Sequence, residues 1–138
     1  MIEVTEYDHV GIRVSDRLRA IAFYSDLGFV PENAETAQTA NAVYIVNKQG
    51  VRIHLVCNGL PAPNDQNILM DIPEKWPGVT HPAFIVRRLQ DVLDWADREG
   101  IEITEGPVEW DGRRITCFMR DPDRNVLEFN ELLRPNLL

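Results

Sequence analysis

The side chains of this chain that are best suited to metal chemistry are three histidines and one carboxylate. They are His9, His54, His81 and Glu128. Three imidazoles and one carboxylate form a competent ligand set for a divalent transition metal such as Zn²⁺, Ni²⁺, Fe²⁺, Mn²⁺ or Co²⁺. Glu128 stands between Leu127 and Phe129, and a carboxylate in such a setting is costly to bury unless another group pairs with it. A strand histidine taken singly is more often a hydrogen-bonded surface or core residue than a ligand, so the elements that carry these residues decide the matter.

Each of the four candidate ligands falls within a predicted strand, at residues 7–14, 51–57, 79–86 and 126–133. Side chains alternate between the two faces of a strand. In the first strand Val10, Ile12 and Val14 share one face, and His9 lies on the other. The other three strands divide in the same way, with the candidate ligand opposite the apolar residues. We expect the apolar faces to pack against helices and the opposite faces to line a concave surface.

Two helices are predicted, each with recognisable end signals. Ser15 and Asp16 are favoured N-cap residues, and Gly28 lies where a C-cap glycine belongs. Between them, residues recur at helical spacing at Leu18, Ile21, Ala22 and Ser25. The second helix is amphipathic and ends at Gly100, and its apolar residues are Leu89, Val92, Leu93 and Ala96.

The remaining segments predict short strands, turns and one long connection. Further strands are expected at 29–33, 42–46, 101–104 and 115–119. The polar run that ends at Asn41 is predicted to be a loop, and residues 47–50 a turn. Gly106-Pro107 is expected to interrupt a strand, and the stretch 59–78, which contains four prolines, reads as a connector.

The order of elements restarts after the connector, which indicates an internal repeat. His9 and His81 are 72 positions apart (81 − 9), as are Gly28 and Gly100 (100 − 28), and His54 and Glu128 are 74 apart (128 − 54). The sequence therefore predicts a single α+β domain over residues 1–138. It consists of two tandem βαβββ modules, at about 5–58 and 79–133, that form a curved mixed sheet around a metal site.

Composition excludes several classes of function. The chain has 138 residues, of which 44% are hydrophobic and 26% charged, as in ordinary globular proteins. A net charge of −8 argues against nucleic acid or an anionic membrane as the partner. No apolar run reaches membrane-spanning length and no signal pattern opens the chain, so we expect a cytoplasmic protein. Cys57 and Cys117 are too few for a disulfide framework or a thiolate zinc site, and we expect two free core thiols.

Several motifs together resemble the vicinal oxygen chelate superfamily, which includes glyoxalase I, bleomycin-resistance proteins and extradiol dioxygenases. The motifs are Asp8-His9-Val10, Phe23-Tyr24 through Leu27-Gly28-Phe29, Arg52-Ile53-His54-Leu55, Thr80-His81-Pro82, Gly106-Pro107-Val108, and Asp121-Pro122-Asp123 leading to Leu127-Glu128. The resemblance covers residues 7–133 and implies that His9, His54, His81 and Glu128 are the metal ligands. The pattern is closest to glyoxalase I, which implies that Arg13 and Asn58 bind a substrate such as a glutathione adduct. The alternative for these two residues is a strand-end salt bridge and a turn.

Three departures from the glyoxalase I pattern leave the substrate open. His54 stands where that enzyme has a glutamate, and Arg124 stands where a glycine usually follows Asp-Pro-Asp. The left-handed turn that favours glycine must therefore be tolerated or avoided by an arginine. No basic cluster precedes His81, because Pro77-Gly78-Val79 occupies that place.

The resemblance implies a metal-dependent lyase or isomerase that removes a proton next to a metal-chelated carbonyl, with Glu128 as the base. A first alternative is an Fe²⁺ extradiol-type dioxygenase that uses His9, His81 and Glu128 as ligands and His54 as an acid or base. A second is a non-enzymatic drug- or metabolite-binding protein, against which the intact ligand set counts. In short two-module members of this superfamily the modules of two chains usually come together. The resemblance therefore implies a homodimer in which each site takes ligands from both chains.

Overall fold

The structure is a computed structural model that describes residues 1–39 and 41–134. The chain divides between Pro61 and Ala62 into two compact units. The first unit contains β1 (Val10–Arg13), α1 (Arg17–Asp26), β2 (Val30–Pro31), α2 (Thr36–Thr39), β3 (Ala42–Val46) and β4 (Arg52–Val56). The second contains the 3-10 turn η1 (Pro63–Asp65), β5 (Ala83–Ile85), α3 (Leu89–Glu99), β6 (Ile103–Trp110), β7 (Arg114–Arg120) and β8 (Val126–Leu132).

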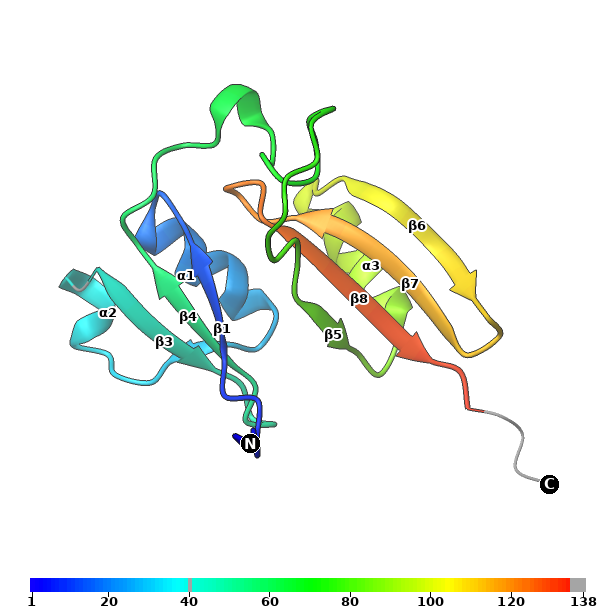
Figure 1. Cartoon of the computed structure of the whole chain (residues 1–138), viewed down its shortest axis with the longest axis horizontal. Coiled ribbons are helices and arrows are strands. Elements are labelled where there is room, and N and C mark those ends of the chain that lie inside the picture. Colours follow the sequence, from blue (N-terminus) through cyan, green and yellow to red (C-terminus); the bar gives the residue numbers. More distant parts are fainter. Residues whose placement is uncertain (40, 135–138) are drawn as a thin grey trace. The chain divides into compact units, whose positions relative to one another are not determined.

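Each unit folds its strands into a four-stranded mixed sheet with the same topology. The strand orders are β1-β4-β3-β2 and β5-β8-β7-β6. In both sheets the first strand of the module runs parallel to the last, and the other neighbours are antiparallel. One helix covers one face of each sheet, α1 in the first unit and α3 in the second (Figure 1). The predicted α+β fold of two tandem βαβββ modules is confirmed.

The two helices end at the predicted signals, but the buried face of α1 differs from the prediction. The Asp16 side chain accepts a hydrogen bond from the Arg19 backbone N–H at 3.0 Å. Ala20 and Tyr24 are buried, whereas Leu18 is 66% exposed. Several stripes of α1 have helical spacing, and the stripe with the large Tyr24 ring contacts Phe29 and is the one that packs. In α3, Trp95 joins the predicted apolar face, and Gly100 closes the helix with a left-handed φ of 68°.

Several predicted boundaries were wrong. The strand expected over residues 7–14 is confined to Val10–Arg13, so His9 lies just before it. The strand expected over residues 79–86 is confined to Ala83–Ile85, so His81 lies two positions before its first residue. The expected break at Gly106-Pro107 is a register shift within the continuous strand β6. Gly106 permits that shift because a Cβ there would lie 2.4 Å from the Thr116 carbonyl oxygen. The expected loop before Asn41 contains the short helix α2, and residue 40 lies outside the described residues.

The helix-covered face of each sheet is the one that the alternation of side chains predicted to be buried, although in the second unit Thr116, Val126 and Asn130 on the other face are buried as well. In the first unit the buried strand residues are Ile12, Val43, Ile45, Ile53 and Leu55. In the second they include Cys117, Met119, Leu127 and Phe129. His54 and Glu128 alternate with these residues and therefore lie on the face of each sheet opposite its helix.

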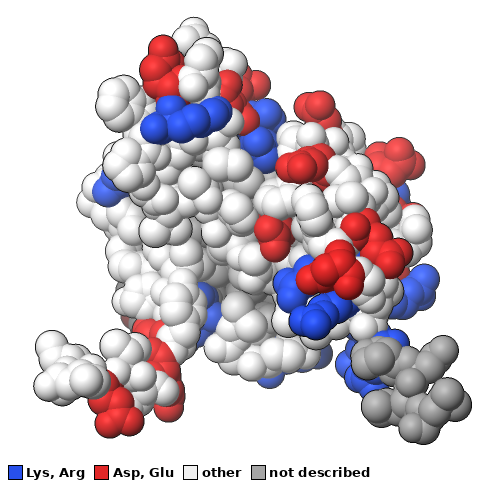
Figure 2. Space-filling view, turned by 45° about the vertical axis from the view of Figure 1, so that its right-hand side comes forward, with Lys and Arg blue, Asp and Glu red and all other residues white. Residues whose placement is uncertain are grey.

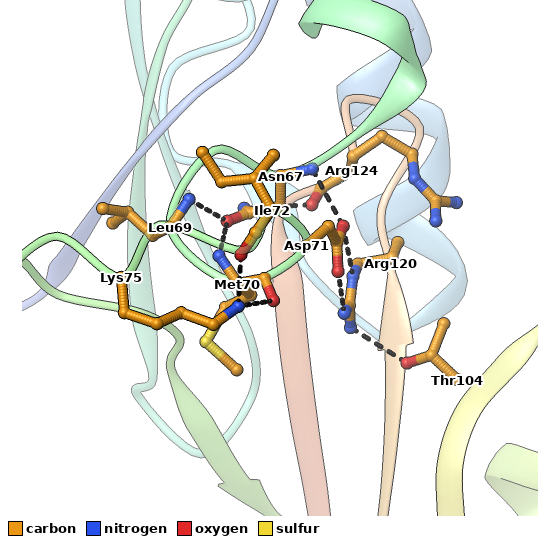
Figure 3. A network of polar contacts seen from close by, with 9 residues as sticks. All are labelled: Asn67, Leu69, Met70, Asp71, Ile72, Lys75, Thr104, Arg120 and Arg124. Atoms are coloured by element: carbon orange, nitrogen blue, oxygen red, sulfur yellow. Dashed lines mark hydrogen bonds and ion pairs between the residues drawn. The ribbon is translucent and has the colours of Figure 1, made fainter.

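The connector is attached to the second unit rather than running free. Asp71 forms an ion pair with Arg120, with 2.8 Å between Oδ1 and Nη2. The same guanidinium donates a hydrogen bond to the Thr104 hydroxyl at 2.9 Å. The Asn67 amide donates to the Arg124 carbonyl at 3.1 Å (Figure 3). The hydrogen bond from Arg120 lowers the pKa of Asp71. Residues 67–75 are thus held against β7 and the turn before β8.

One face of the molecule carries charges of both signs. On the face shown in Figure 2, Lys and Arg side chains lie among Asp and Glu side chains instead of forming a continuous basic patch. None of the helices within residues 1–39 and 41–134 has the length and apolar character needed to cross a bilayer.

Candidate metal centre

The first unit brings together two of the predicted ligands, His9 and His54. His9 directly precedes β1, and β1 pairs in parallel with β4 so that Gly11 lies beside His54. The two imidazole rings are 5.6 Å apart between centroids and are nearly perpendicular. Both side chains are partly buried. The pairing of the first strand with the last therefore places these histidines side by side, although 45 positions separate them in the sequence (54 − 9).

The orientation of His54 is fixed by an aromatic stack. Tyr44 lies opposite His54 in the antiparallel pairing of β3 and β4. Their rings are 4.2 Å apart and only 8° from parallel. The Arg52 guanidinium lies 4.4 Å from the centroid of the Tyr44 ring, a cation–π arrangement. These contacts restrict rotation of the imidazole.

Arg52 also links this stack to two carboxylates. Its Nε and Nη2 donate to Glu32 at 2.8 and 3.0 Å, and Nη1 donates to Asp8 at 3.3 Å. The hydrogen bond from Arg52 lowers the pKa of Glu32. Asp8 is hydrogen-bonded in turn to His9, with 2.5 Å between Oδ2 and Nδ1, and this bond lowers the pKa of Asp8. One network therefore holds both histidines of the first unit.

The second unit brings together the other two predicted ligands, His81 and Glu128. The parallel pairing of β5 with β8 places Ala83 beside Glu128. His81 Nε2 lies 3.1 Å from Glu128 Oε1, and both side chains are mostly shielded from solvent. The other ring nitrogen of His81 is 2.8 Å from the Thr80 hydroxyl. Phe118, opposite Glu128 on β7, presents its ring edge-on to His81 at 5.3 Å.

The second oxygen of Glu128 is attached to the interior. Asn130 Nδ2 donates to Glu128 Oε2 at 2.7 Å, and the Thr116 hydroxyl donates to Asn130 Oδ1 at 2.6 Å. Asn130 and Thr116 are buried. Because a carboxylate accepts hydrogen bonds, the amide nitrogen of Asn130 must face it, and the hydroxyl satisfies the amide oxygen. Both oxygens of Glu128 are thus positioned by neighbours.

The two pairs occupy equivalent places in the repeat. Gly11 pairs with His54 in the first unit, as Ala83 pairs with Glu128 in the second. Tyr44 lies across from His54 as Phe118 lies across from Glu128. The register of the strands, and not only the spacing in the sequence, therefore repeats.

Each unit contributes one pair of candidate ligands, His9 with His54 and His81 with Glu128. Among residues 1–39 and 41–134, no group of three or more His, Cys, Asp or Glu side chains is close enough to hold a metal ion. The chemistry of the two pairs nevertheless suits a divalent transition metal, because imidazole and carboxylate are its usual nitrogen and oxygen ligands. The donor types of each pair therefore fit such an ion.

The other residues singled out by the sequence also have defined surroundings. Arg13 Nε donates to Asn58 Oδ1 at 3.1 Å, so the two residues expected to bind substrate contact each other. Arg124 adopts the left-handed conformation, with φ at 68°, so the arginine tolerates the turn that favours glycine. Both cysteines are free, and burial raises the pKa of Cys57 and raises that of Cys117 to about 11. Neither thiol is therefore predisposed to be a thiolate ligand.

The sequence did not reveal the residues that orient the candidate ligands. These residues are Asp8, Tyr44, Thr80, Thr116 and Asn130. Two of them had a usable signal, since Asp8 and Thr80 each precede a candidate histidine and are 72 positions apart (80 − 8). Tyr44 could have been found by counting outward from the turn at residues 47–50, because that turn sets which residues of the hairpin face each other.

Comparison with known proteins identifies the family. The family model described as the glyoxalase/bleomycin resistance protein/dioxygenase superfamily matches residues 6–129. Among curated proteins, virulence protein STM3117 of Salmonella typhimurium is 28% identical over 133 residues, covering 93% of this chain and 85% of that protein. Its crystal structure matches with a TM-score of 0.64 and 26% identity, over 96% of this chain and all of the other.

More distant crystal structures share the fold. A glyoxalase family protein from Bacillus cereus matches with a TM-score of 0.70 at 17% identity, over 96% of this chain and 97% of that one. A glyoxalase/dioxygenase from Nostoc punctiforme matches with a TM-score of 0.72 at 14% identity, over 97% of this chain and 100% of that one. Members of the superfamily commonly bind divalent metals. With a match across most of its length, the chain belongs to the glyoxalase/bleomycin resistance protein/dioxygenase superfamily.

Proposed function

We propose that this protein is a divalent-metal-dependent lyase or isomerase of the glyoxalase I type, which removes a proton from the carbon next to a substrate carbonyl. The observation that carries the proposal is the repetition of one ligand pair per module at the same strand register. In this proposal four residues hold the ion. A first module supplies His9 and His54, and a second module supplies His81 and Glu128. A bound ion would polarise the substrate carbonyl and stabilise negative charge on its oxygen.

Glu128 is the proton acceptor in the proposed reaction. It is the one carboxylate among the four ligand candidates, and general bases in enzymes are commonly carboxylates held within hydrogen-bond reach of the proton. Asn130 and His81 each contact one of its oxygens, at 2.7 and 3.1 Å, so the group has a defined orientation. His54, its counterpart in the repeat, is neutral or cationic, and one carboxylate remains to take up the proton.

Arg13 and Asn58 form the proposed substrate-binding pair. A guanidinium beside a carboxamide offers several N–H donors in one place, which suits a carboxylate or another anionic group of a small molecule. Arg13 Nε already donates to Asn58 Oδ1 at 3.1 Å, which orients the guanidinium. A glutathione adduct, whose γ-glutamyl end carries a carboxylate, is the first candidate substrate.

We further propose that the protein acts in the cytoplasm as a homodimer. A four-ligand site requires one pair of each kind, and two chains that exchange modules would supply two such sites. Light scattering of metal-loaded protein tests this assembly, because the mass of two chains is expected and the mass of one chain would contradict it.

The test of the reaction is isomerisation of the methylglyoxal–glutathione hemithioacetal by metal-loaded protein, together with deuterium exchange from solvent at the substrate carbon. Both are expected. Oxygen consumption with catechols, without isomerisation, would instead support the Fe²⁺ dioxygenase. Equilibrium binding of a small molecule without any turnover would support a non-enzymatic binding protein and contradict the proposal.

A further inference from the structure

Asp8 and Thr80 occupy equivalent positions in the two units, and each contacts a candidate histidine, but through chemically different groups. Each precedes the candidate histidine of its unit, and each places a side-chain oxygen at Nδ1 of that ring. The distances are 2.5 Å from Asp8 Oδ2 to His9 Nδ1 and 2.8 Å from Thr80 Oγ1 to His81 Nδ1. An ionised carboxylate can only accept a hydrogen bond, whereas a hydroxyl can donate or accept one. The two contacts therefore need not hold the same tautomer.

The surroundings of Asp8 determine where the proton of His9 lies. Asp8 Oδ2 accepts a hydrogen bond from Arg52 Nη1 at 3.3 Å and lies 2.5 Å from His9 Nδ1. The carboxylate has no proton to give, so the bond requires a proton on His9 Nδ1. In a neutral imidazole only one nitrogen is protonated, and Nε2 of His9 then carries a lone pair.

The surroundings of His81 lead to the opposite arrangement. Its Nε2 faces Glu128 Oε1 at 3.1 Å, and Glu128 Oε2 already accepts from Asn130 at 2.7 Å. With the carboxylate accepting at both oxygens, the proton between the two groups belongs to Nε2. Nδ1 of the neutral ring is then an acceptor, and the Thr80 hydroxyl is the donor that satisfies it.

We propose that the equivalent histidines are held in opposite tautomers, His9 with its proton on Nδ1 through Asp8 and His81 with its proton on Nε2 through Glu128. His9 therefore presents the lone pair of Nε2 to an incoming cation without rearrangement. His81 offers Nε2 only after its hydrogen bond to Glu128 is broken and that proton has left. Asp8 is a positioning residue that acts through His9. The consequence for metal binding rests on the proposed function, whereas the tautomers are a property of the metal-free chain.

The test is a long-range ¹H–¹⁵N correlation spectrum of the full chain, labelled with ¹⁵N in histidine and stripped of metal, at alkaline pH where imidazole is ordinarily neutral. The chain has three histidines, so the variants His9→Gln, His54→Gln and His81→Gln assign every signal. We expect the Nδ1–H pattern for His9 and the Nε2–H pattern for His81. The same tautomer at both positions would overturn the proposal.

Substitutions of the neighbouring residues separate positioning from folding. Asp8→Ala should move His9 to the Nε2–H form that imidazole prefers in water, while Asp8→Asn, whose amide oxygen still accepts, should retain the wild-type form. Thr80→Ala should leave His81 unchanged, because Glu128 still holds its Nε2 proton. Zn²⁺ affinity should fall about 10- to 100-fold in Asp8→Ala and much less in Asp8→Asn.

The outcomes distinguish this inference from the proposed function. If His9 keeps its tautomer in Asp8→Ala, or if that variant binds Zn²⁺ as tightly as wild type, Asp8 has no positioning role. If the tautomers are as expected but wild type binds no Zn²⁺, the inference holds and the metal-dependent function fails. If Zn²⁺ binds and the tautomers are the same, the metal site holds and the inference fails.

Discussion

The Asn130 amide nitrogen lies 2.7 Å from Glu128 Oε2. The two residues are two positions apart on β8, so their side chains lie on the same face of the sheet. The Thr116 hydroxyl on β7 fixes the other end of that amide at 2.6 Å. Since Asn130 and Thr116 are buried, Glu128 is anchored within its own unit by a chain of oriented donors. In the proposed reaction, the carboxylate that takes the proton from the substrate is thereby held in one place.

This anchoring predicts graded losses of activity. Glu128→Gln should lower kcat for hemithioacetal isomerisation by at least about 10²-fold, because the base is lost. Asn130→Ala should cost about 10- to 100-fold, because the base remains but loses a neighbour that orients it. Steady-state kinetics on folded, metal-loaded variants measures both effects. Unchanged kcat in Glu128→Gln would remove Glu128 from the reaction.

The stack of Tyr44 on His54 predicts a difference between two substitutions at one position. Tyr44→Phe keeps an aromatic ring 4.2 Å from the imidazole and should leave Zn²⁺ affinity within about 2-fold of wild type. Tyr44→Ala removes the ring that restricts His54 and should weaken Zn²⁺ binding about 10-fold or more. Titration calorimetry distinguishes the variants, and equal affinities in both would show that the stack does not orient the ligand.

The sequence was sufficient for the parts of the fold that rest on short-range patterns. Alternation identified β3 and the buried face of β4, and Gly100 marked the end of α3. It failed where tertiary packing chose among equivalent patterns, as in α1, whose buried residues are Ala20 and Tyr24 rather than the stripe that includes Leu18. It also overextended β5, because the ladder with β8 begins at Ala83, one residue after the Pro82 carbonyl that accepts from the Glu128 N–H at 3.1 Å.

In the candidate site, the candidate ligands could be predicted from the sequence, whereas the residues that orient them could not. Residue type, alternation and the repeat selected His54 and Glu128, and the parallel pairing of first and last strands brought each beside a predicted partner. The polar residues that orient them are found by register and side-chain direction. The 2.6 Å contact between Thr116 and Asn130 could not be predicted from the sequence pattern, because it depends on the register in which β7 and β8 pair.

The ion pair of Asp71 with Arg120 predicts a pH-dependent contribution to stability. The pKa of Asp71 is lowered in the folded state, chiefly by this hydrogen bond, so the contribution is fully present above the ordinary pKa of about 4 and is lost as the pH falls through the lower folded value. Asp71→Asn should reduce the free energy of unfolding at pH 7 by about 1–3 kcal/mol. The difference from wild type should shrink below about pH 4.

A matched control for this prediction is the exposed pair of Arg88 and Asp91, whose charged atoms are 3.7 Å apart and whose side chains are each 65% exposed. Asp91→Asn should change the free energy of unfolding by less than about 0.5 kcal/mol, because solvent screens such pairs. Urea denaturation over a range of pH compares the variants. Equal effects of the two substitutions would show that the connector is not held by Asp71.

The close approach of β6 to β7 predicts that Gly106 is intolerant of a side chain. A Cβ at Gly106 would lie 2.4 Å from the Thr116 carbonyl oxygen, and φ there is 85°. Gly106→Ala should therefore cost about 2–4 kcal/mol of unfolding free energy. Gly112 has a φ of 66° but no heavy atom within 4 Å of a Cβ, so Gly112→Ala should cost only about 1–2 kcal/mol. A smaller loss in Gly106→Ala than in Gly112→Ala would contradict the steric argument.

Metal analysis of protein purified without chelators tests whether the pairs His9–His54 and His81–Glu128 serve one ion, as proposed. The expected result for wild type is about one divalent ion per chain, the stoichiometry of a single four-ligand site. His9→Ala and His81→Ala, which each damage one pair, should both release most of it. An absence of bound metal in wild type, even after incubation with Zn²⁺, Ni²⁺ and Fe²⁺, would contradict the account, and so would full occupancy in either variant.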